Sequence, residues 1–157
     1  MNPFENKVIV VTGGSDGIGK ELVESFLQMG AKVATCGRNY DKLYPLQSAY
    51  SGKPLMIYAA DISKEQEANN FIDSVIKTFG TIDILINNAG ISMRATVEDV
   101  SLDALRKVMD INFWGTVYCT KFSLPYIIEN KGTIVGVSSI AGYRGLPGRS
   151  GYSASKF

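Results

Sequence analysis

The fold of this chain is decided by residues 8–19, which read VIVVTGGSDGIG. Four apolar residues run into Thr12 and a glycine-dense turn, and apolar residues at helical spacing follow Gly19. Residues 8–11 are apolar without alternation, which predicts a strand buried on both faces of a parallel sheet. Glycines let the backbone approach a phosphate closely, and a helix N-terminus attracts the anion. The order strand, turn, helix therefore predicts a dinucleotide site. The glycines are not spaced G-x-G-x-x-G, however, and an ordinary glycine-rich turn is the alternative.

The composition is that of a soluble globular protein. The chain has 157 residues, of which 45% are hydrophobic and 20% charged, and its net charge is +1. This length suits one domain, and the near-neutral charge gives no electrostatic case for a nucleic-acid partner or an acidic membrane surface. The absence of histidine excludes Ser–His and Cys–His nucleophiles and the common zinc sites, and Cys36 and Cys119 show no metal-ligand spacing. Without a signal peptide or a bilayer-length apolar run, we expect a cytoplasmic protein with no membrane segment.

Strand and helix patterns alternate along the whole chain. The expected strands are residues 7–12, 32–36, 55–59, 82–86 and 133–137, and the expected helices are residues 17–29, 40–50, 64–79, 101–130 and a last one from 152 onward. Ser63 and Gln66 resemble a capping box for the third helix. Pro45 is expected to shorten or kink the second helix, and Pro125 to kink the fourth near its end. The alternation predicts an α/β fold with a doubly wound parallel sheet. The chain ends about one turn past Tyr152 without a cap, so we expect residues 1–157 to be a single domain cut from a longer protein.

Three polar side chains near the end of the chain are candidates for chemistry. Tyr152 and Lys156 are four residues apart and share a helix face, where an ammonium favours the phenolate of a tyrosine that acts as acid and base. Ser139 follows the last strand, at the sheet edge where open α/β sheets bind ligands. A Tyr-x-x-x-Lys pair or a serine after a strand is common by itself. The prediction depends on these features occurring together, in order, in an alternating chain.

In this combination the sequence resembles a short-chain dehydrogenase/reductase over its whole length. The resemblance is carried by TGGSDGIG at 12–19, Asp61 after the third strand, NNAG at 87–90, Asn112, and YSASK at 152–156 with Ser139 thirteen residues before Tyr152. It implies a Rossmann-like three-layer fold with strand order 3-2-1-4-5 and the last strands missing. That truncation would leave the fifth strand as an unpaired edge and would end the domain at the start of the active-site helix. The parent protein would be a homodimer or homotetramer.

The resemblance also implies a reaction and a role for each residue. Tyr152 would exchange a proton with the oxygen of a small-molecule ketone or secondary alcohol, Lys156 would hold the nicotinamide ribose, and Ser139 would position the substrate oxygen. Asn112 would hold, through its helix backbone, a water that links Lys156 to solvent. The implied cofactor-binding residues are Thr12, Gly13, Ser15, Asp16, Gly17, Ile18, Gly19, Gly37, Arg38, Asp61, Ile62, Asn88, Ala89, Gly90, Tyr152 and Lys156. The alternative function is a truncated nucleotide-binding fragment with little or no turnover.

The residues after the second strand favour NADP(H) over NAD(H). An acidic residue there would bind the adenosine ribose of NAD, whereas this chain has Gly37 followed by Arg38. A guanidinium fork suits a 2′-phosphate, although a solvated turn arginine is the alternative. Asp16 argues against this choice, because many NADP-preferring relatives carry a basic residue in the glycine loop.

The substrate is less constrained by the sequence. Residues 91–94 and 140–149 contribute apolar side chains together with Arg94, Arg144 and Arg149. These residues permit an apolar carbonyl compound with an anionic end, but we favour the interpretation that the arginines are solvated loop residues. The pattern also resembles hydroxysteroid dehydrogenases, 3-ketosphinganine reductases and 3-oxoacyl-carrier reductases, and it does not choose among them.

Overall fold

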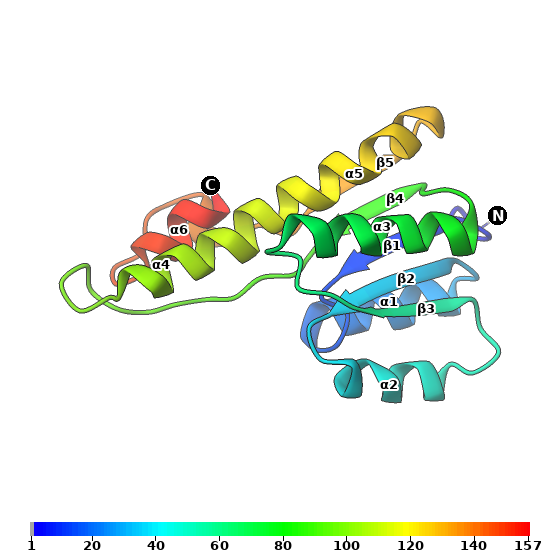
Figure 1. Cartoon of the computed structure of the whole chain (residues 1–157), viewed down its shortest axis with the longest axis horizontal. Coiled ribbons are helices and arrows are strands. Elements are labelled where there is room, and N and C mark those ends of the chain that lie inside the picture. The colour runs from blue at the N-terminus through cyan, green and yellow to red at the C-terminus, as the bar shows by residue number, and fades with distance from the viewer. Residues whose placement is uncertain (1) are drawn as a thin grey trace.

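Five parallel strands form one sheet in the order β3-β2-β1-β4-β5 in the computed structural model, which describes residues 2–157 (Figure 1). The strands are Val8–Thr12 (β1), Lys32–Gly37 (β2), Leu55–Ala59 (β3), Ile84–Asn87 (β4) and Thr133–Gly136 (β5). All four neighbouring pairs are parallel. The doubly wound α/β sheet and its strand order, both expected from the sequence, are confirmed.

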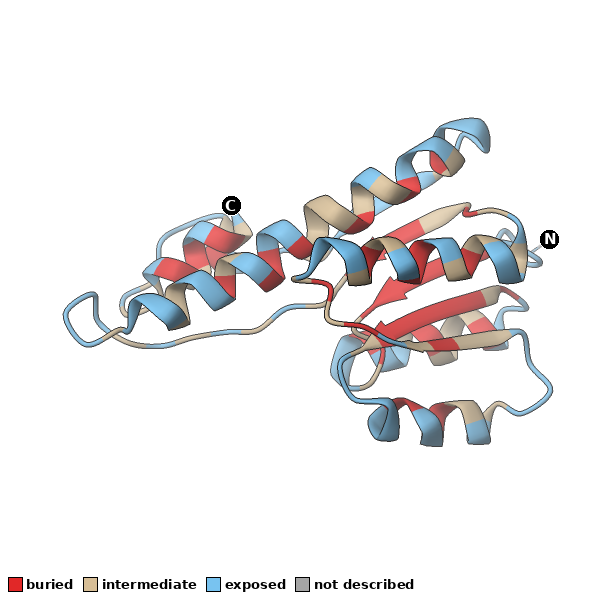
Figure 2. Ribbon diagram, in the orientation of Figure 1, coloured by how far each residue is buried: buried red, intermediate tan, exposed pale blue. Residues whose placement is uncertain are grey.

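Helices cover both faces of the sheet. They are Gly17–Gln28 (α1), Tyr40–Ala49 (α2), Glu65–Phe79 (α3), Leu102–Met109 (α4), Gly115–Glu129 (α5) and Ser150–Lys156 (α6). Figure 1 shows α3 and α5 running side by side across one face, with α1 behind the sheet. Figure 2 shows that buried residues are concentrated in the central strands and the inner sides of these helices.

β1 is the centre of the core because its side chains are apolar in both directions. Ile9 and Val11 pack with residues of α1 and α2, whereas Val8 and Val10 pack with residues of α3 and α5. All five residues of β1 are buried. The uninterrupted apolar run in the sequence therefore has a direct structural cause, since two separate apolar clusters meet across this strand.

The helix expected over residues 101–130 is continuous but not uniform. It consists of α4, a π-helical turn at Asp110–Trp114 and α5, and the backbone stays helical through both junctions. A π turn inserts one wide turn into an α-helix and occurs frequently at functional sites. Asn112 lies in this turn. Pro125 is accommodated within α5.

The capping box expected at Ser63 and Gln66 is wrong. The Ser63 hydroxyl instead donates to Asp61 Oδ1 at 2.7 Å, and α3 begins without a side-chain cap. The Glu67 carboxylate reaches back and accepts a hydrogen bond from the Asp61 backbone N–H at 2.7 Å.

Pro45 does not end α2, which continues to Ala49. β4 begins two residues later than expected, and α6 begins two residues earlier.

β5 is the outer strand on one side of the sheet, and among the described residues it pairs with β4 alone. All four of its residues are exposed, including Ile134 and Val135. The unpaired edge expected from the sequence is therefore present. Within residues 2–157, no helix combines the length and apolar character that crossing a bilayer requires.

Candidate active site

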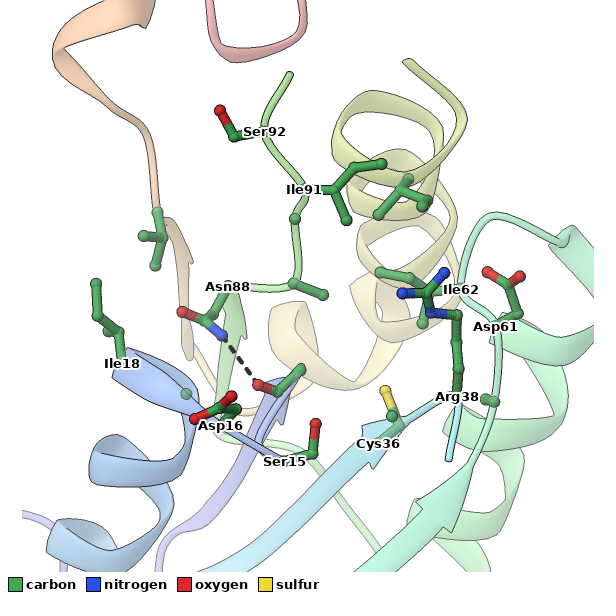
Figure 3. Close-up of a pocket in the computed structure, with 18 of the residues that line it drawn as sticks. Ser15, Asp16, Ile18, Cys36, Arg38, Asp61, Ile62, Asn88, Ile91 and Ser92 are labelled. Atoms are coloured by element: carbon green, nitrogen blue, oxygen red, sulfur yellow. Dashed lines mark hydrogen bonds between the residues drawn. The ribbon is translucent and has the colours of Figure 1, made fainter. Parts of the chain in front are cut away.

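A pocket of about 580 Å³ lies across the carboxyl ends of all five strands (Figure 3). It is lined by Gly13, Ser15, Asp16, Ile18, Gly19, Cys36, Gly37, Arg38, Ala60, Asp61, Ile62, Asn88, Ala89, Gly90, Ile91, Ser92, Ile111, Val137, Ser138, Tyr152 and Lys156. Each strand contributes the residues that follow it, because parallel strands all end at the same sheet edge. Of the sixteen residues expected to bind the cofactor, fourteen line this pocket and Thr12 and Gly17 do not.

Two glycines of the loop after β1, Gly13 and Gly19, are packed too closely for a side chain. A Cβ on Gly19 would overlap the Gly13 carbonyl oxygen and Asn88 Nδ2, and a Cβ on Gly13 would lie 2.9 Å from the Ala89 Cα. Gly13 and Gly17 also have positive φ angles of 74° and 52°, which favour glycine. Beside Gly17 there is open space. The loop therefore forms a bare backbone cradle at the N-terminus of α1, and these residues fit a diphosphate.

Thr12 holds the glycine loop against the segment after β4. Its Oγ1 accepts hydrogen bonds from the backbone N–H groups of Asn88 and Ala89, each at 3.0 Å, and Asn88 Nδ2 donates to the Thr12 carbonyl at 2.9 Å. The Thr12 side chain is buried. Its position is thus behind the pocket wall, where it joins the ends of two neighbouring strands.

Two oppositely charged side chains, Arg38 and Asp61, line the end of the pocket near β2 and β3. Arg38 and Asp61 follow these two strands, and the Asp61 carboxylate is fixed by accepting from the Ser63 N–H and hydroxyl. Within residues 2–157, Arg38 has no carboxylate partner within 4.0 Å. Asp16 caps α1, because its Oδ1 accepts from the Gly17 N–H at 2.7 Å. Asp16, the acidic residue of the glycine loop, therefore has a structural role as the N-cap of α1.

α6 brings Tyr152 and Lys156 to the opposite end of the pocket. Lys156 Nζ donates to the Val137 carbonyl at 2.8 Å, and Ser138 Oγ donates to the Lys156 carbonyl at 2.9 Å. These two bonds fasten α6 to the chain that leaves β5. Ser138 lines the pocket, whereas the Ser139 hydroxyl caps a short 3-10 turn, Ile140–Gly142, by accepting from the Ala141 N–H at 3.2 Å.

Asn112 is buried behind the pocket and connects three segments. Its Oδ1 accepts from the Ile91 N–H at 2.8 Å, and its Nδ2 donates to the Ile91 carbonyl and to Ser155 Oγ, both at 2.9 Å. Its own carbonyl accepts from the Thr116 hydroxyl at 2.9 Å. Asn112 therefore ties the segment after β4 to α6, and Gly90 lies beside both Asn112 Oδ1 and Lys156 Nζ.

Seven pocket-lining residues were not among the residues expected to bind the cofactor or to act in catalysis, although two of them, Ile91 and Ser92, belong to the segment 91–94 expected near the substrate. The seven are Cys36, Ala60, Ile91, Ser92, Ile111, Val137 and Ser138. Most of them are adjacent in sequence to an expected residue. They could have been predicted from the register of the parallel sheet, which places the residues after each strand at the same edge. Cys36, the fifth residue of β2, is buried, and this burial raises the pKa of its thiol to about 12.

The sequence of this chain is similar to known proteins over nearly its whole length. A family model described as short chain dehydrogenase matches residues 7–157. "Dehydrogenase/reductase SDR family member 7B" of Mus musculus is 42% identical over 98% of this chain and 50% of that protein. "11-beta-hydroxysteroid dehydrogenase-like 2" of Arabidopsis thaliana is 38% identical over 98% of this chain and 52% of that protein. The chain thus spans about half the length of these relatives.

Among solved structures, a short chain dehydrogenase/reductase from Burkholderia phymatum in complex with NAD superposes with a TM-score of 0.94. The two sequences are 24% identical, and the match covers 99% of this chain and 57% of that one. At this identity the likeness establishes the fold.

Proposed function

The chain belongs to the short-chain dehydrogenase family, and from this membership we propose that it forms the cofactor-binding half of an NADP(H)-dependent oxidoreductase that interconverts a ketone and a secondary alcohol. The observation that carries the proposal is the shared pocket. The glycine loop and the Tyr152–Lys156 pair, which are separated by most of the sequence, line the same cavity. One molecule bound there can meet a phosphate cradle at one end and an acid–base pair at the other.

In this proposal the chain's own residues hold the cofactor and move a proton. A bound nicotinamide dinucleotide supplies or accepts the hydride. The Tyr152 hydroxyl donates a proton to the carbonyl oxygen during reduction and takes it back during oxidation. Lys156, which the Val137 carbonyl holds in place, binds ribose hydroxyls at the end of the pocket that Tyr152 also lines. Ser139 positions the substrate oxygen, with the pocket-lining Ser138 as the alternative, and Asn112 holds a water near Lys156.

The preference for NADP(H) is supported by Arg38. Its guanidinium has no carboxylate partner within the described chain, and Ser15 Oγ lies beside Gly37 at the same end of the pocket. A charge-assisted hydrogen bond from arginine to phosphate is stronger than a neutral one. Asp16 does not weigh heavily against the choice, because its carboxylate caps α1.

Replacing Arg38 by alanine tests the cofactor. We expect the Kd for NADPH to rise by roughly tenfold or more, which corresponds to about 1.5 kcal/mol for a lost hydrogen bond to a charged group. The Kd for NADH should change little. Fluorescence titration with both nucleotides measures this, and Lys53→Ala, which removes a charge in an exposed loop, is the control. Equal losses for NADPH and NADH would contradict the preference.

The reaction itself is tested with Tyr152→Phe. We expect this variant to lose roughly 100-fold or more in the rate of carbonyl reduction, because the proton donor is gone, whereas its affinity for NADPH should fall much less. A steroid ketone, a sphingoid ketone and a 3-oxoacyl thioester form a suitable substrate panel. Turnover that survives this substitution would refute the role of Tyr152.

A second candidate is a nucleotide-binding chain with little or no turnover. It is favoured by the exposed edge at β5, which among the described residues pairs with β4 alone, and by the chain's spanning about half the length of its relatives. NADPH binding without oxidation on any panel member would support it. For the whole protein we propose a cytoplasmic homodimer or homotetramer.

A further inference from the structure

Arg149, which the sequence suggested to be a solvated loop residue, packs against the tyrosine of the proposed site. It is half-buried, and its guanidinium carbon lies 5.9 Å from the centroid of the Tyr152 ring. At this distance a cation over a ring face is attracted by the ring quadrupole. The same guanidinium donates from Nη1 to Ser92 Oγ at 2.6 Å. One side chain therefore contacts two residues that line the pocket.

These are part of a larger set of contacts between residues 91–95 and the loop before α6. The Ala95 N–H donates to the Gly148 carbonyl at 2.9 Å, and Asn112 holds Ile91 by two hydrogen bonds. Residues 91–95 are thus tied to α6 and to the loop before it from both ends, with Arg149 between the two ties. Within residues 2–157, no carboxylate lies within 4.0 Å of the Arg149 guanidinium. Its contacts are therefore with the ring and the serine rather than with an ion-pair partner.

We propose that Arg149 is a positioning residue for Tyr152: it holds the ring against one wall of the pocket and fixes Ser92 on the facing segment. This inference rests on the proposed function, in which the Tyr152 hydroxyl meets the substrate oxygen. The planar guanidinium suits both tasks, because it stacks on a ring face and donates in its own plane. A misplacement of the reacting group by about 1 Å can cost roughly 100-fold in rate. Holding the Tyr152 ring in place should therefore raise the rate by a measurable factor.

Three substitutions separate the parts of this arrangement. Arg149→Met keeps a long side chain and removes the charge and the donors, Arg149→Lys keeps the charge without the planar fork, and Ser92→Ala removes the acceptor. Arg144→Met is the matched control, because Arg144 lies in the same loop, is exposed and makes no side-chain hydrogen bond or ion pair within the described residues. Each variant is compared for NADPH affinity, for kcat and KM on the best panel substrate, and by 19F NMR of the 3-fluorotyrosine-labelled protein.

The NMR signal of Tyr152, assigned by its loss in Tyr152→Phe, reports the ring directly and needs no turnover. We expect Arg149→Met to shift and narrow this signal and to lower kcat by roughly tenfold or more, with the Kd for NADPH unchanged. Arg149→Lys should recover part of both effects, and Ser92→Ala should act in the same direction more weakly. Adding Ser92→Ala to Arg149→Met should cause no further change in kcat.

Two results would overturn the inference. In the first, Arg149→Met leaves the Tyr152 signal and kcat as Arg144→Met does. In the second, it weakens NADPH binding as much as it lowers kcat, which indicates a general loss of structure. If the parent chain neither binds NADPH nor turns over, the proposed function fails, and the NMR signal still decides whether Arg149 holds the ring.

Discussion

At the scale of single residues, two buried thiols link the pocket to the core. Cys36 lines the pocket and Cys119 lies on α5, and both belong to the same apolar cluster. Burial raises the pKa of the Cys36 thiol from 9.0 to about 12, and burial also raises the pKa of Cys119. Neither thiol can ionise in the folded protein at a pH where an unfolded chain already ionises.

The raised pKa of Cys36 predicts a loss of stability in alkali. Its contribution is fully present below the unfolded pKa near 9.0 and is lost as the pH rises toward about 12. Over that window we expect the free energy of unfolding to fall by up to about 1.4 kcal/mol per pH unit for this thiol. Urea unfolding measured at several pH values, for the parent chain and Cys36→Ala, gives the difference. The two proteins differ only at this side chain, so identical slopes would rule out this contribution.

At the scale of secondary-structure elements, the π turn between α4 and α5 determines how the two halves of the site meet. The wide turn carries Asn112, whose amide makes three hydrogen bonds to Ile91 and Ser155. One amide side chain thereby joins the chain after β4 to α6. The elements that hold Tyr152 and Lys156 depend on this connection.

Asn112→Ala should therefore destabilise the protein and loosen one specific region. Because the partly buried Ile91 N–H and carbonyl lose their partner, we expect a loss of about 2–3 kcal/mol in the free energy of unfolding. Hydrogen exchange should increase in residues 91–95 and in α6. Asn70→Ala, which removes an exposed hydrogen bond to Gln66, should stay within about 0.5 kcal/mol of the parent. Equal protection of α6 in both variants would contradict this account.

Sequence patterns were sufficient for the elements and insufficient for the contacts between them. The strands and helices were predictable because unbroken apolar runs and helical spacing each have one stable solution in an alternating chain. The capping box failed because Glu67, one residue beyond Gln66, reaches the Asp61 backbone instead. The π turn and the ring contact of Arg149 depend on tertiary packing, which residue spacing does not encode. Similarly, the 3-10 turn after β5 decides that Ser138 lines the pocket while Ser139 caps the turn.

At the scale of the whole molecule, the exposed edge at β5 is the main surface feature. Ile134 and Val135 are each 39% exposed on an open strand, and Ile128 of the neighbouring helix α5 is 67% exposed. An unprotected strand edge with apolar side chains is a template for pairing with another chain. We therefore expect the molecule to associate with other chains through this side.

We expect Val135→Lys to reduce self-association, because a charge on an edge strand opposes pairing. Sedimentation velocity over a concentration series measures the effect. Val97→Lys is the control, since Val97 is exposed in a loop that belongs to no strand. If both substitutions change association equally, overall charge rather than the edge is responsible.

The central place of β1 also has a consequence for synthesis on the ribosome. Val10 pairs with Ala34 on one side and with Leu85 on the other, and Leu85 is added 75 positions after Val10. At typical translation rates this interval is roughly 4–15 s. β1 can therefore pair with β2 early, whereas its other edge stays unpaired until β4 has been synthesised. Slow codons between positions 34 and 85 would lengthen the period in which the nascent chain needs a chaperone.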